Sequence, residues 1–226
     1  MRKLFFLQIL FIGTLFFFSS CSDDVSEIIT AIDGIVENSN GDRVSGAKIA
    51  ITYQIQSPQG PFTTPANGTV LQISVPSNQR VTLRVKDDNN QVVIRTLIDR
   101  ELQAGQHSFL WDLRNSKEKV VLSGLYFAET EFEDKSESFP FFVNIPNYSI
   151  YKFDEISFIA TTDQDGRFEI DRDELLFNNV SLGDLNMTLN NQFTIWAIDT
   201  DSRVTQNNDV FFDSTQSSPV QIRISF

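Results

Sequence analysis

Hydrophobic and polar residues alternate along most of the chain from about residue 28 onward, and no sustained helical repeat interrupts this alternation. Val81, Leu83 and Val85, for example, are separated by Thr and Arg. A period of two residues is typical of an antiparallel strand that has one face in a core and the other in solvent. Turn-forming sequences such as Asn40-Gly41 separate these segments. Short alternating segments at this spacing predict an all-β protein built from β-sandwiches.

The first twenty residues follow a different pattern, with a short basic start and a single apolar run. Arg2 and Lys3 precede the apolar residues 4–18, and two serines follow. This order predicts an export signal. As a helix, the apolar run would extend about 22 Å at ~1.5 Å per residue, which is short of the ~30 Å hydrocarbon layer that a permanent span must cross. We therefore expect residues 1–20 to be cleaved from the mature protein.

Cys21, the only cysteine in the chain, directly follows this signal. The segment Phe18-Ser19-Ser20-Cys21 resembles a bacterial lipobox, although Phe18 stands where the lipobox usually has leucine. In a lipobox, the cysteine thiol receives a diacylglyceryl group and becomes the new N-terminus. The resemblance implies a membrane anchor at Cys21 with the two or three acyl chains that stable anchoring needs. The alternative is an ordinary secretory signal followed by a chance cysteine, although this lone thiol can form no intramolecular disulfide.

A short polar tether, residues 21–28, connects this cysteine to the first alternating segment. It begins with Ser22, Asp23 and Asp24. A serine and acidic run beside the lipidated cysteine resembles the surface-export signal of lipoproteins of the Bacteroidota. The resemblance implies an outer-membrane lipoprotein that faces the cell exterior. The alternative is a solvated linker, since acidic residues are common in flexible tethers.

The charge of the chain narrows the classes of partner. The full sequence has 18 basic and 30 acidic residues, a net charge of -12, and removing Arg2 and Lys3 with the signal leaves 16 against 30, or -14. Such a surface repels phosphate backbones, so we expect no nucleic-acid partner. The membrane, through the N-terminal lipid, and an unidentified protein or glycan at the cell surface are the expected partners.

Residues 62–133 contain several short motifs in a fixed order. The motifs are residues 81–87 (VTLRVKD), residues 102–107 (LQAGQH), Trp111-Asp112 and residues 121–127 (VLSGLYF). Together they resemble the Ig-like domain of the flagellar hook-capping protein, a β-sandwich also found in many secreted bacterial proteins. Leu113 and Glu118 stand where that family usually has glycine, which leaves the conformation of the turn around Asn115 open.

A second set of segments lies on both sides of this region. Its members are residues 32–36, 44–51, 160–170, 193–198 and 220–226. They resemble the strands of the carboxypeptidase regulatory-like domain, a transthyretin-like β-sandwich, split in two by the Ig-like segment. Domain insertion is tolerated at exposed loop tips. We therefore predict two β-sandwich domains, one inserted in the other, with a split host at residues 29–57 and 137–226 and an insert at residues 58–136.

The residues that catalysis usually requires are scarce. His107 is the only histidine, and it falls within the Ig-like motifs at a structural position. Cys21 is assigned to the lipid, so a Ser-His-Asp or Cys-His arrangement has little to draw on. Clustered His and Cys ligands for zinc are also missing. We expect no enzymatic activity, no cofactor and no metal, although thirty acidic residues leave many carboxylate pairs that no spacing distinguishes.

One segment has partial calcium-loop spacing. Asp163, Asp165 and Gly166 fall at the third, fifth and sixth positions of the loop pattern if Thr161 is the first. Arg172 then occupies the twelfth position, where the pattern needs a bidentate carboxylate. A cation there would repel the ion, so we interpret the segment as a polar hairpin turn.

Aromatic residues are the remaining candidates for binding, because exposed rings can stack on sugars or anchor a protein interface. Trp111 falls in the Ig-like motif and Trp196 lies in an apolar segment, so a core position is expected for both, with ligand stacking by Trp196 as the alternative. Phenylalanines cluster at residues 139–142 and 211–212. Two functions therefore remain: a lipid-anchored, surface-exposed binding or structural module, and a glycan-binding lipoprotein for polysaccharide capture.

Overall fold

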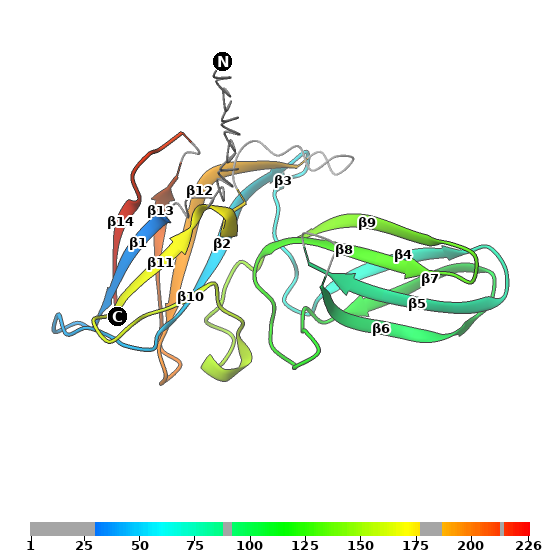
Figure 1. Cartoon of the computed structure of the whole chain (residues 1–226), viewed down its shortest axis with the longest axis horizontal. Coiled ribbons are helices and arrows are strands. Elements are labelled where there is room, and N and C mark those ends of the chain that lie inside the picture. The colour runs from blue at the N-terminus through cyan, green and yellow to red at the C-terminus, as the bar shows by residue number, and fades with distance from the viewer. Residues whose placement is uncertain (1–29, 88–91, 177–186, 213–214) are drawn as a thin grey trace, which may run out of the picture.

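The structure, a computed structural model, describes residues 30–87, 92–176, 187–212 and 215–226, and it is an all-β protein with several sheets. The strands lie in two groups that follow one another along the longest axis of the molecule (Figure 1). The first group contains β1 (Thr30–Glu37), β2 (Lys48–Ser57), β3 (Gly60–Pro61), β10 (Ala160–Thr161), β11 (Arg167–Asp171), β12 (Thr188–Ile198), β13 (Val204–Phe211) and β14 (Val220–Ser225). The second contains β4 (Thr69–Val75), β5 (Gln79–Lys86), β6 (Val93–Leu102), β7 (Gly105–Trp111), β8 (Gly124–Glu131) and β9 (Ser136–Val143).

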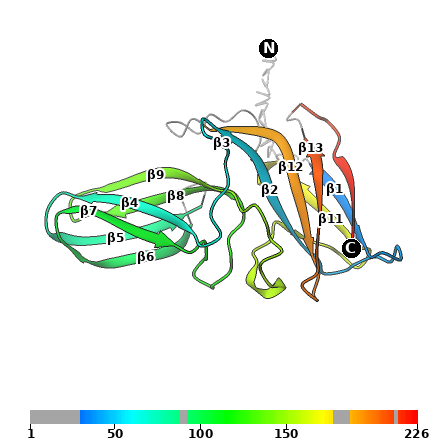
Figure 2. The same ribbon diagram turned by 180° about the vertical axis from the view of Figure 1, so that it is seen from behind.

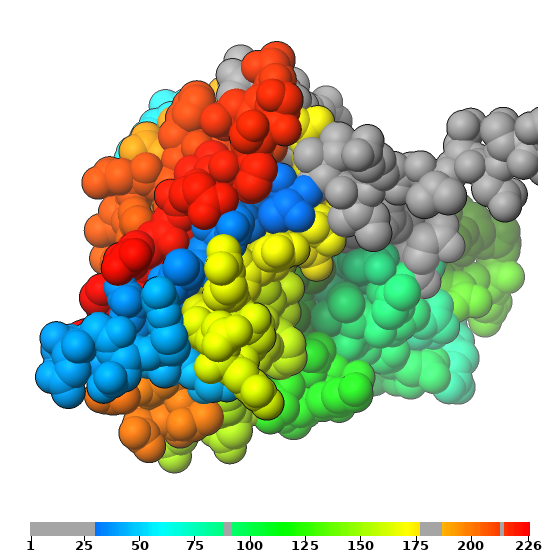
Figure 3. All heavy atoms as spheres, turned by 60° about the vertical axis from the view of Figure 1, so that its left-hand side comes forward, coloured from blue at the N-terminus to red at the C-terminus, as the bar shows by residue number. Residues whose placement is uncertain are grey.

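The first sandwich packs a three-stranded sheet, in the order β11-β1-β14, against a sheet in the order β10-β2-β12-β13, with β3 paired to β2. β1 is antiparallel to β11 and parallel to β14. Figure 3 shows these three strands side by side on one face of the molecule, in yellow, blue and red. Between the sheets lies a core of fully buried side chains that includes Ile32, Ile49 and Phe193.

The second sandwich packs a four-stranded sheet, in the order β6-β5-β8-β9, against a two-stranded sheet of β4 and β7. The alternation expected from the sequence is confirmed in β5, where Val81, Leu83 and Val85 are fully buried. Trp111 is fully buried in this core, as expected, and donates its indole N–H to the Arg114 carbonyl oxygen over 2.9 Å. Burying a side chain of this size makes it a main source of the stability of the sandwich.

The chain leaves the first sandwich after β3, passes through β4 to β9, and returns to the first sandwich at β10, as can be followed in Figures 1 and 2. β9 pairs with β8 from Ser136 to Val143. The expected boundary at residue 136 therefore coincides with the start of a strand that belongs to the second sandwich. β9 does not alternate, since its first five residues are all exposed and its last three are all buried, so periodicity gave no sign of it.

The turn around Asn115 takes the backbone conformation that glycine adopts most readily. Leu113 and Glu118 have φ angles of 60° and 58°, in the left-handed region that non-glycine residues rarely occupy. The Asn115 side chain accepts hydrogen bonds from the backbone N–H groups of Lys117 and Lys119 over 2.9 and 3.0 Å. Side-chain capping of this kind holds the turn although both positions lack glycine.

Helical structure in the described ranges is confined to two single 3-10 turns, η1 (Phe153–Glu155) and η2 (Arg172–Glu174). In η1, the Glu155 carboxylate accepts a hydrogen bond from the Lys152 backbone N–H over 3.0 Å, which closes the turn. Among the residues that the structure describes, no helix has the length and apolar character needed to cross a membrane.

A ladder of charged side chains covers the solvent face of the four-stranded sheet. Arg84 lies 3.4 Å from the Glu129 carboxylate and 2.6 Å from that of Glu131, and Lys86 lies 2.7 Å from Glu129. The side chains of Lys86 and Glu129 are only 16% and 17% exposed, so solvent screens this pair less than an ordinary surface pair. Burial opposes ionisation of Glu129, but hydrogen bonds and charges from Lys86 and Arg84 outweigh it and lower the pKa of Glu129.

We expect Glu129→Gln to make the stability of the protein less sensitive to acid. A carboxyl whose pKa is lowered in the folded state stabilises the fold above its unfolded pKa, about 4.3 for glutamate, and this contribution is lost as the pH falls through the folded value. The free energy of unfolding should therefore fall less steeply below about pH 5 in Glu129→Gln than in the wild type. Urea denaturation at several pH values measures this slope. Glu133→Gln, at an exposed loop position, should keep the wild-type slope, and an unchanged slope in Glu129→Gln would contradict the prediction.

Candidate functional site

Side chains take the place of a strand along the edge of β2 between its partners β10 and β3. The Asn144 side chain accepts a hydrogen bond from the Tyr53 backbone N–H over 3.0 Å and donates to the Tyr53 carbonyl oxygen over 2.9 Å, as an opposing strand would do. Two residues away, the Tyr148 hydroxyl donates to the Ile51 carbonyl oxygen over 3.3 Å. The segment that returns from the second sandwich therefore completes the edge of the first.

Asn144 also joins the outgoing and returning connections between the sandwiches. Its Nδ2 donates to the Phe62 carbonyl oxygen over 2.9 Å, and its backbone N–H donates to the Thr64 hydroxyl over 2.8 Å. The Thr64 backbone N–H donates in turn to the Asn144 carbonyl oxygen over 2.8 Å. Asn144 is only 2% exposed, so these bonds are made where water cannot readily replace them. The two connections are thus fixed side by side.

Tyr148 packs the returning segment onto the outer face of β12. Its ring is fully buried and meets the Trp196 indole edge to face, with centroids 5.9 Å apart. Its hydroxyl accepts a hydrogen bond from the Ser123 backbone N–H over 3.0 Å. Burial raises the pKa of Tyr148 to about 12, although hydrogen bonds from Ser123 oppose the rise. The hydroxyl therefore stays protonated at neutral pH and keeps its bond to β2.

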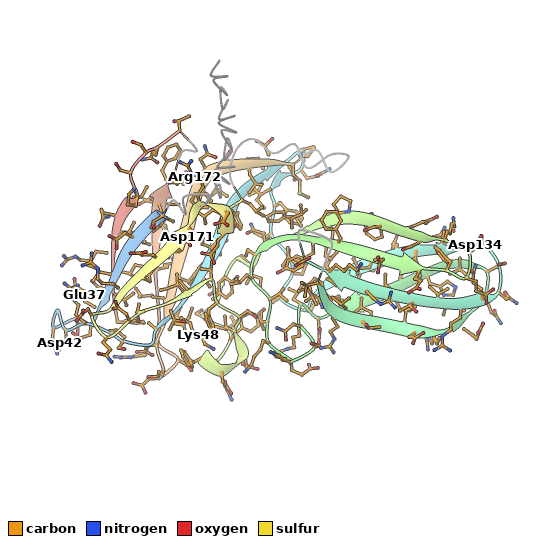
Figure 4. All side chains as sticks on the ribbon, viewed as in Figure 1. Glu37, Asp42, Lys48, Asp134, Asp171 and Arg172 are labelled. Carbon is orange, nitrogen blue, oxygen red and sulfur yellow. The ribbon has the colours of Figure 1, made fainter. Side chains whose placement is uncertain are left out.

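Lys48, the first residue of β2, holds the η1 turn against that strand. Figure 4 marks the position of Lys48 beside the turn. Its ammonium group donates to the carbonyl oxygens of Phe153 and Ile156 over 2.6 and 3.2 Å. It also lies 4.3 Å from the centroid of the Phe153 ring. Burial, followed by the charge of Lys119, lowers the pKa of Lys48. Together with Asn144 and Tyr148, Lys48 makes the connection between the sandwiches a packed and hydrogen-bonded junction.

An open hollow of about 390 Å³ lies where this returning segment meets β12 and β13. We call it the polar hollow. It is lined by Pro146, Asn147, Ser149, Thr194, Trp196, Gln206 and Asn208. Its volume falls within the range of about 300–1,000 Å³ that is typical of small-molecule sites. The lining contains no charged side chain, although the chain as a whole is strongly acidic.

Four polar side chains around the polar hollow make no hydrogen bond with the rest of the described chain: Ser149, Thr194, Gln206 and Asn208. Gln206 and Asn208 alternate on β13 and so lie on one face, and Gln206 is paired across the sheet with Trp196. Hydroxyl and amide groups each donate and accept hydrogen bonds without a charge. The arrangement can therefore bind a neutral polar ligand.

Trp196 forms one wall of the polar hollow but does not offer an open ring face. It is 8% exposed, and its indole N–H donates to the Thr52 hydroxyl over 2.8 Å. With Tyr148 packed against it, little ring area is left for a sugar to stack on. The structure favours the core position expected for Trp196, with the edge of the indole as a boundary of the hollow.

The residues expected to carry the lipid and the surface-export signal, Cys21 with Ser22, Asp23 and Asp24, lie outside the described residues. The first described residue, Thr30, begins β1 and follows Cys21 by nine positions. The tether would therefore join the first sandwich, and the second sandwich extends away from it. Figure 4 shows the extent of the two sandwiches: Glu37, the last residue of β1, and Asp42 lie at one end of the molecule and Asp134 at the other.

His107 lies on the two-stranded sheet of the second sandwich, far along the chain from the polar hollow. Its Nε2 donates to the Gln103 carbonyl oxygen over 2.8 Å, and its ring is stacked on Phe109 with centroids 6.3 Å apart. The hydrogen bond ties β7 to the loop before it, and the ring contact packs His107 against its neighbour on the same face of β7.

The segment with calcium-loop spacing forms a turn between β10 and β11, but not the expected hairpin, because β10 pairs with β2 and β11 pairs with β1 in a different sheet. The Asp163 carboxylate accepts hydrogen bonds from the backbone N–H groups of Asp165 and Arg167, both over 2.8 Å, so it closes the turn itself. Arg172 points elsewhere and donates to the Gln216 carbonyl oxygen over 2.6 Å. Within the described ranges, no three His, Cys, Asp or Glu side chains are grouped closely enough to hold a metal ion.

Sequence reasoning did not find the polar hollow or the junction. Asn144, Tyr148 and Gln206 belong to segments that alternation alone does not bring together. One signal was available: residues 205–209 (TQNND) are polar throughout, although they lie between apolar β-type positions. Of the clustered phenylalanines, Phe141, Phe142 and Phe212 are buried, and Phe139 and Phe211 are exposed.

Neither the protein-family models nor the curated proteins contain a match to this chain.

Proposed function

We propose that this chain is an exported, lipid-anchored binding or structural module that faces the cell exterior and has no chemical step of its own. The sequence order around Cys21 supports the anchor, and Asp23 and Asp24 support display on the outer membrane. The observation that carries the binding function is the polar hollow, where four neutral polar side chains that have no hydrogen-bond partner among the described residues converge on one space. Unpaired polar groups at a concave surface are suited to hydrogen-bond a ligand.

We also propose that the second sandwich is a domain inserted in the first, with sheet boundaries at about residues 62 and 143. The strand order supports this arrangement, because β4 to β9 pair only among themselves while β2 pairs with β10 and β12. The junction at Asn144 and Tyr148 would hold the two sandwiches in one orientation. One core cluster contains Ala50, Trp196 and Ile198 of the first sandwich together with residues of the second. This shared packing supports a fixed orientation of the two sandwiches.

Two classes of ligand fit the proposal: a protein at the cell surface, and a glycan. The neutral lining of the polar hollow favours the glycan, because sugar hydroxyls pair with amides and hydroxyls that both donate and accept. A protein partner would instead be expected to bury an aromatic or arginine anchor in a desolvated pocket. The glycan-capturing lipoprotein is therefore the second candidate function, and the polar hollow is its site.

We expect the double variant Gln206→Ala/Asn208→Ala to lose most of its ligand affinity. Each lost neutral hydrogen bond costs about 0.5–1.5 kcal/mol, so the loss of two should weaken binding by about 1–3 kcal/mol, or roughly 5- to 150-fold. The measurement is a screen of the purified mature chain on glycan and cell-surface protein arrays, followed by calorimetry on the strongest ligand. Both side chains are exposed, so the fold should be unaffected.

Two further variants serve as controls in this experiment. Gln106→Ala removes another exposed glutamine, from β7 of the second sandwich, and should leave binding unchanged. His107→Ala tests the absence of a chemical step. Unreduced affinity in the double variant would move the ligand site away from the polar hollow, and a turnover reaction abolished by His107→Ala would overturn the non-catalytic proposal.

A further inference from the structure

The two-stranded sheet of β4 and β7, which we call the β4–β7 ribbon, is narrower than the four-stranded sheet that it covers. Within the described ranges, each of its strands pairs only with the other, so each has one open edge. Every second residue along such an edge directs its N–H and C=O groups away from the existing partner. An open edge is a template for a further strand.

The ribbon also lacks the charged residues that usually protect an edge. Among the edge strands of five or more residues in the described chain, only β4 (TVLQISV) and β7 (GQHSFLW) contain no Asp, Glu, Lys or Arg. β6, β11, β13 and β14 each contain at least one charged residue, and β9 contains Glu137 and Pro140. Charge and proline at an edge oppose pairing with another chain. The ribbon is the one described edge pair that leaves such pairing unopposed.

Apolar side chains are exposed on and beside the ribbon. Val70 and Leu110, paired across it, are 56% and 58% exposed. Phe139 on β9 is on the core side of its sheet, opposite the fully buried Ala128, yet it is 36% exposed. In Figures 1 and 2, β4 is the ribbon strand on the side of β9, and β7 is the one on the side of β6. A strand added along β4 would cover the side on which Phe139 is exposed.

We propose that the open edge of β4 pairs antiparallel with β4 of a second copy of this chain. The register must place core-facing residues of one copy opposite core-facing residues of the other, so that the two strands form one continuous sheet. A two-fold axis at Gln72 does this for all seven residues of β4. Leu71 of one copy then lies opposite Ile73 of the other, both on the core side. The result is a four-stranded sheet in the order β7-β4-β4-β7 that extends through the dimer.

The charge of the chain favours this edge over the others for self-association. Each mature copy would have a net charge of about -14, taken as 16 basic against 30 acidic residues, so most faces of two copies repel one another. β4 is a seven-residue strand that adds no charge to the contact. An isologous contact of this kind pairs the open β4 edge of both copies at once, so the β4 contact itself closes after two copies. This inference does not depend on the lipid anchor or on the polar hollow.

The test uses the purified mature chain with Cys21→Ser, which has no other cysteine. We expect sedimentation velocity to show a dimer, and Val70→Lys to raise its dissociation constant about tenfold or more, because it puts a charge on the outer face of the paired strand. Phe211→Lys is the matched control, since Phe211 is 55% exposed on β13 of the first sandwich, and it should leave the dimer unchanged.

Cysteine crosslinking tests the register directly. Gln72→Cys in the Cys21→Ser background should form a disulfide-linked dimer under mild oxidation, because residues directly opposite in an antiparallel pair lie about 4.5–5.5 Å apart between Cα atoms, within disulfide range. Ser108→Cys, which replaces the residue paired with Gln72 on β7 of the same copy, should not crosslink. A chain that stays monomeric overturns the proposal. A dimer that crosslinks through Ser108→Cys and not Gln72→Cys, or that Val70→Lys leaves intact, also overturns it.

Discussion

Asn144→Ala should lower the free energy of unfolding by about 3 kcal/mol, because leaving a buried polar group unsatisfied costs about 1–3 kcal/mol and this change leaves several. The groups are the N–H and C=O of Tyr53 and the C=O of Phe62, all of which bond to the Asn144 side chain. Asn144 is only 2% exposed, so water has limited access to replace it. A loss of this size is a large part of the ~5–15 kcal/mol that stabilises an ordinary domain.

Urea denaturation followed by tryptophan fluorescence measures this effect, since Trp111 and Trp196 are both buried and lie in the core cluster that spans the junction. Asn208→Ala is the matched control: Asn208 is exposed, and its side chain has no hydrogen-bond partner in the described chain, so the change should stay within about 0.5 kcal/mol. Equal stability of the two variants would show that Asn144 does not hold the junction.

Thr64→Val keeps this prediction testable if Asn144→Ala does not fold. It removes the hydroxyl that accepts the Asn144 backbone N–H while keeping the side-chain volume nearly constant. One buried donor is then left without a partner, and the expected loss is about 1–3 kcal/mol. An unchanged free energy of unfolding in this variant would contradict the role assigned to the junction.

Alternation predicted the strands well because it reports a local property, the division of each strand between core and solvent. Val81, Leu83 and Val85 are buried in β5 as expected, and the Asn40-Gly41 turn places Gly41 at a φ of 84°. The all-β fold with sandwich layers followed from such segments. The predicted boundary at residue 136 leaves β9 outside the insert, because the Ig-like motifs end before it and β9, an edge strand in which Pro140 is tolerated, does not alternate.

The junction and the polar hollow were not predictable in this way, because they depend on contacts between distant segments. Asn144 and Tyr53 are 91 residues apart, and nothing in either local pattern indicates that an amide will complete a strand edge. Gln206 and Ser149 reach the same hollow only because β13 pairs with β12 beside the returning segment. The aromatic residues in the sequence indicate Trp196 as a candidate for ligand stacking. In the structure Tyr148 packs against Trp196, so the polar side chains around Trp196 are the groups that can contact a ligand.

Cys21→Ser should move the protein from the membrane fraction to the soluble fraction, the largest change in behaviour expected from any single substitution here. If Cys21 is lipidated, its acyl chains are the attachment, and each buried CH₂ contributes about 0.8 kcal/mol. The largest fully buried side chains of the described sandwiches, such as Trp111 and Phe193, lie in the cores and are not available to anchor a membrane. Ser22→Ala, which changes the next residue and keeps the thiol, is the matched control and should remain membrane-bound.

Mass spectrometry of the mature N-terminus and protease treatment of intact cells separate the two parts of this prediction. The wild-type N-terminus should carry the mass of the acylated cysteine, and the protein should be digested on intact cells while periplasmic markers survive. Asp23→Asn/Asp24→Asn should keep the lipid but become protected from protease, because only the acidic run beside the anchor is changed. Cys21→Ser that stays with the membrane would refute the anchor. A lipidated wild type that is fully protected would instead place the protein on the inner face of the outer membrane, and would assign Asp23 and Asp24 to a solvated tether.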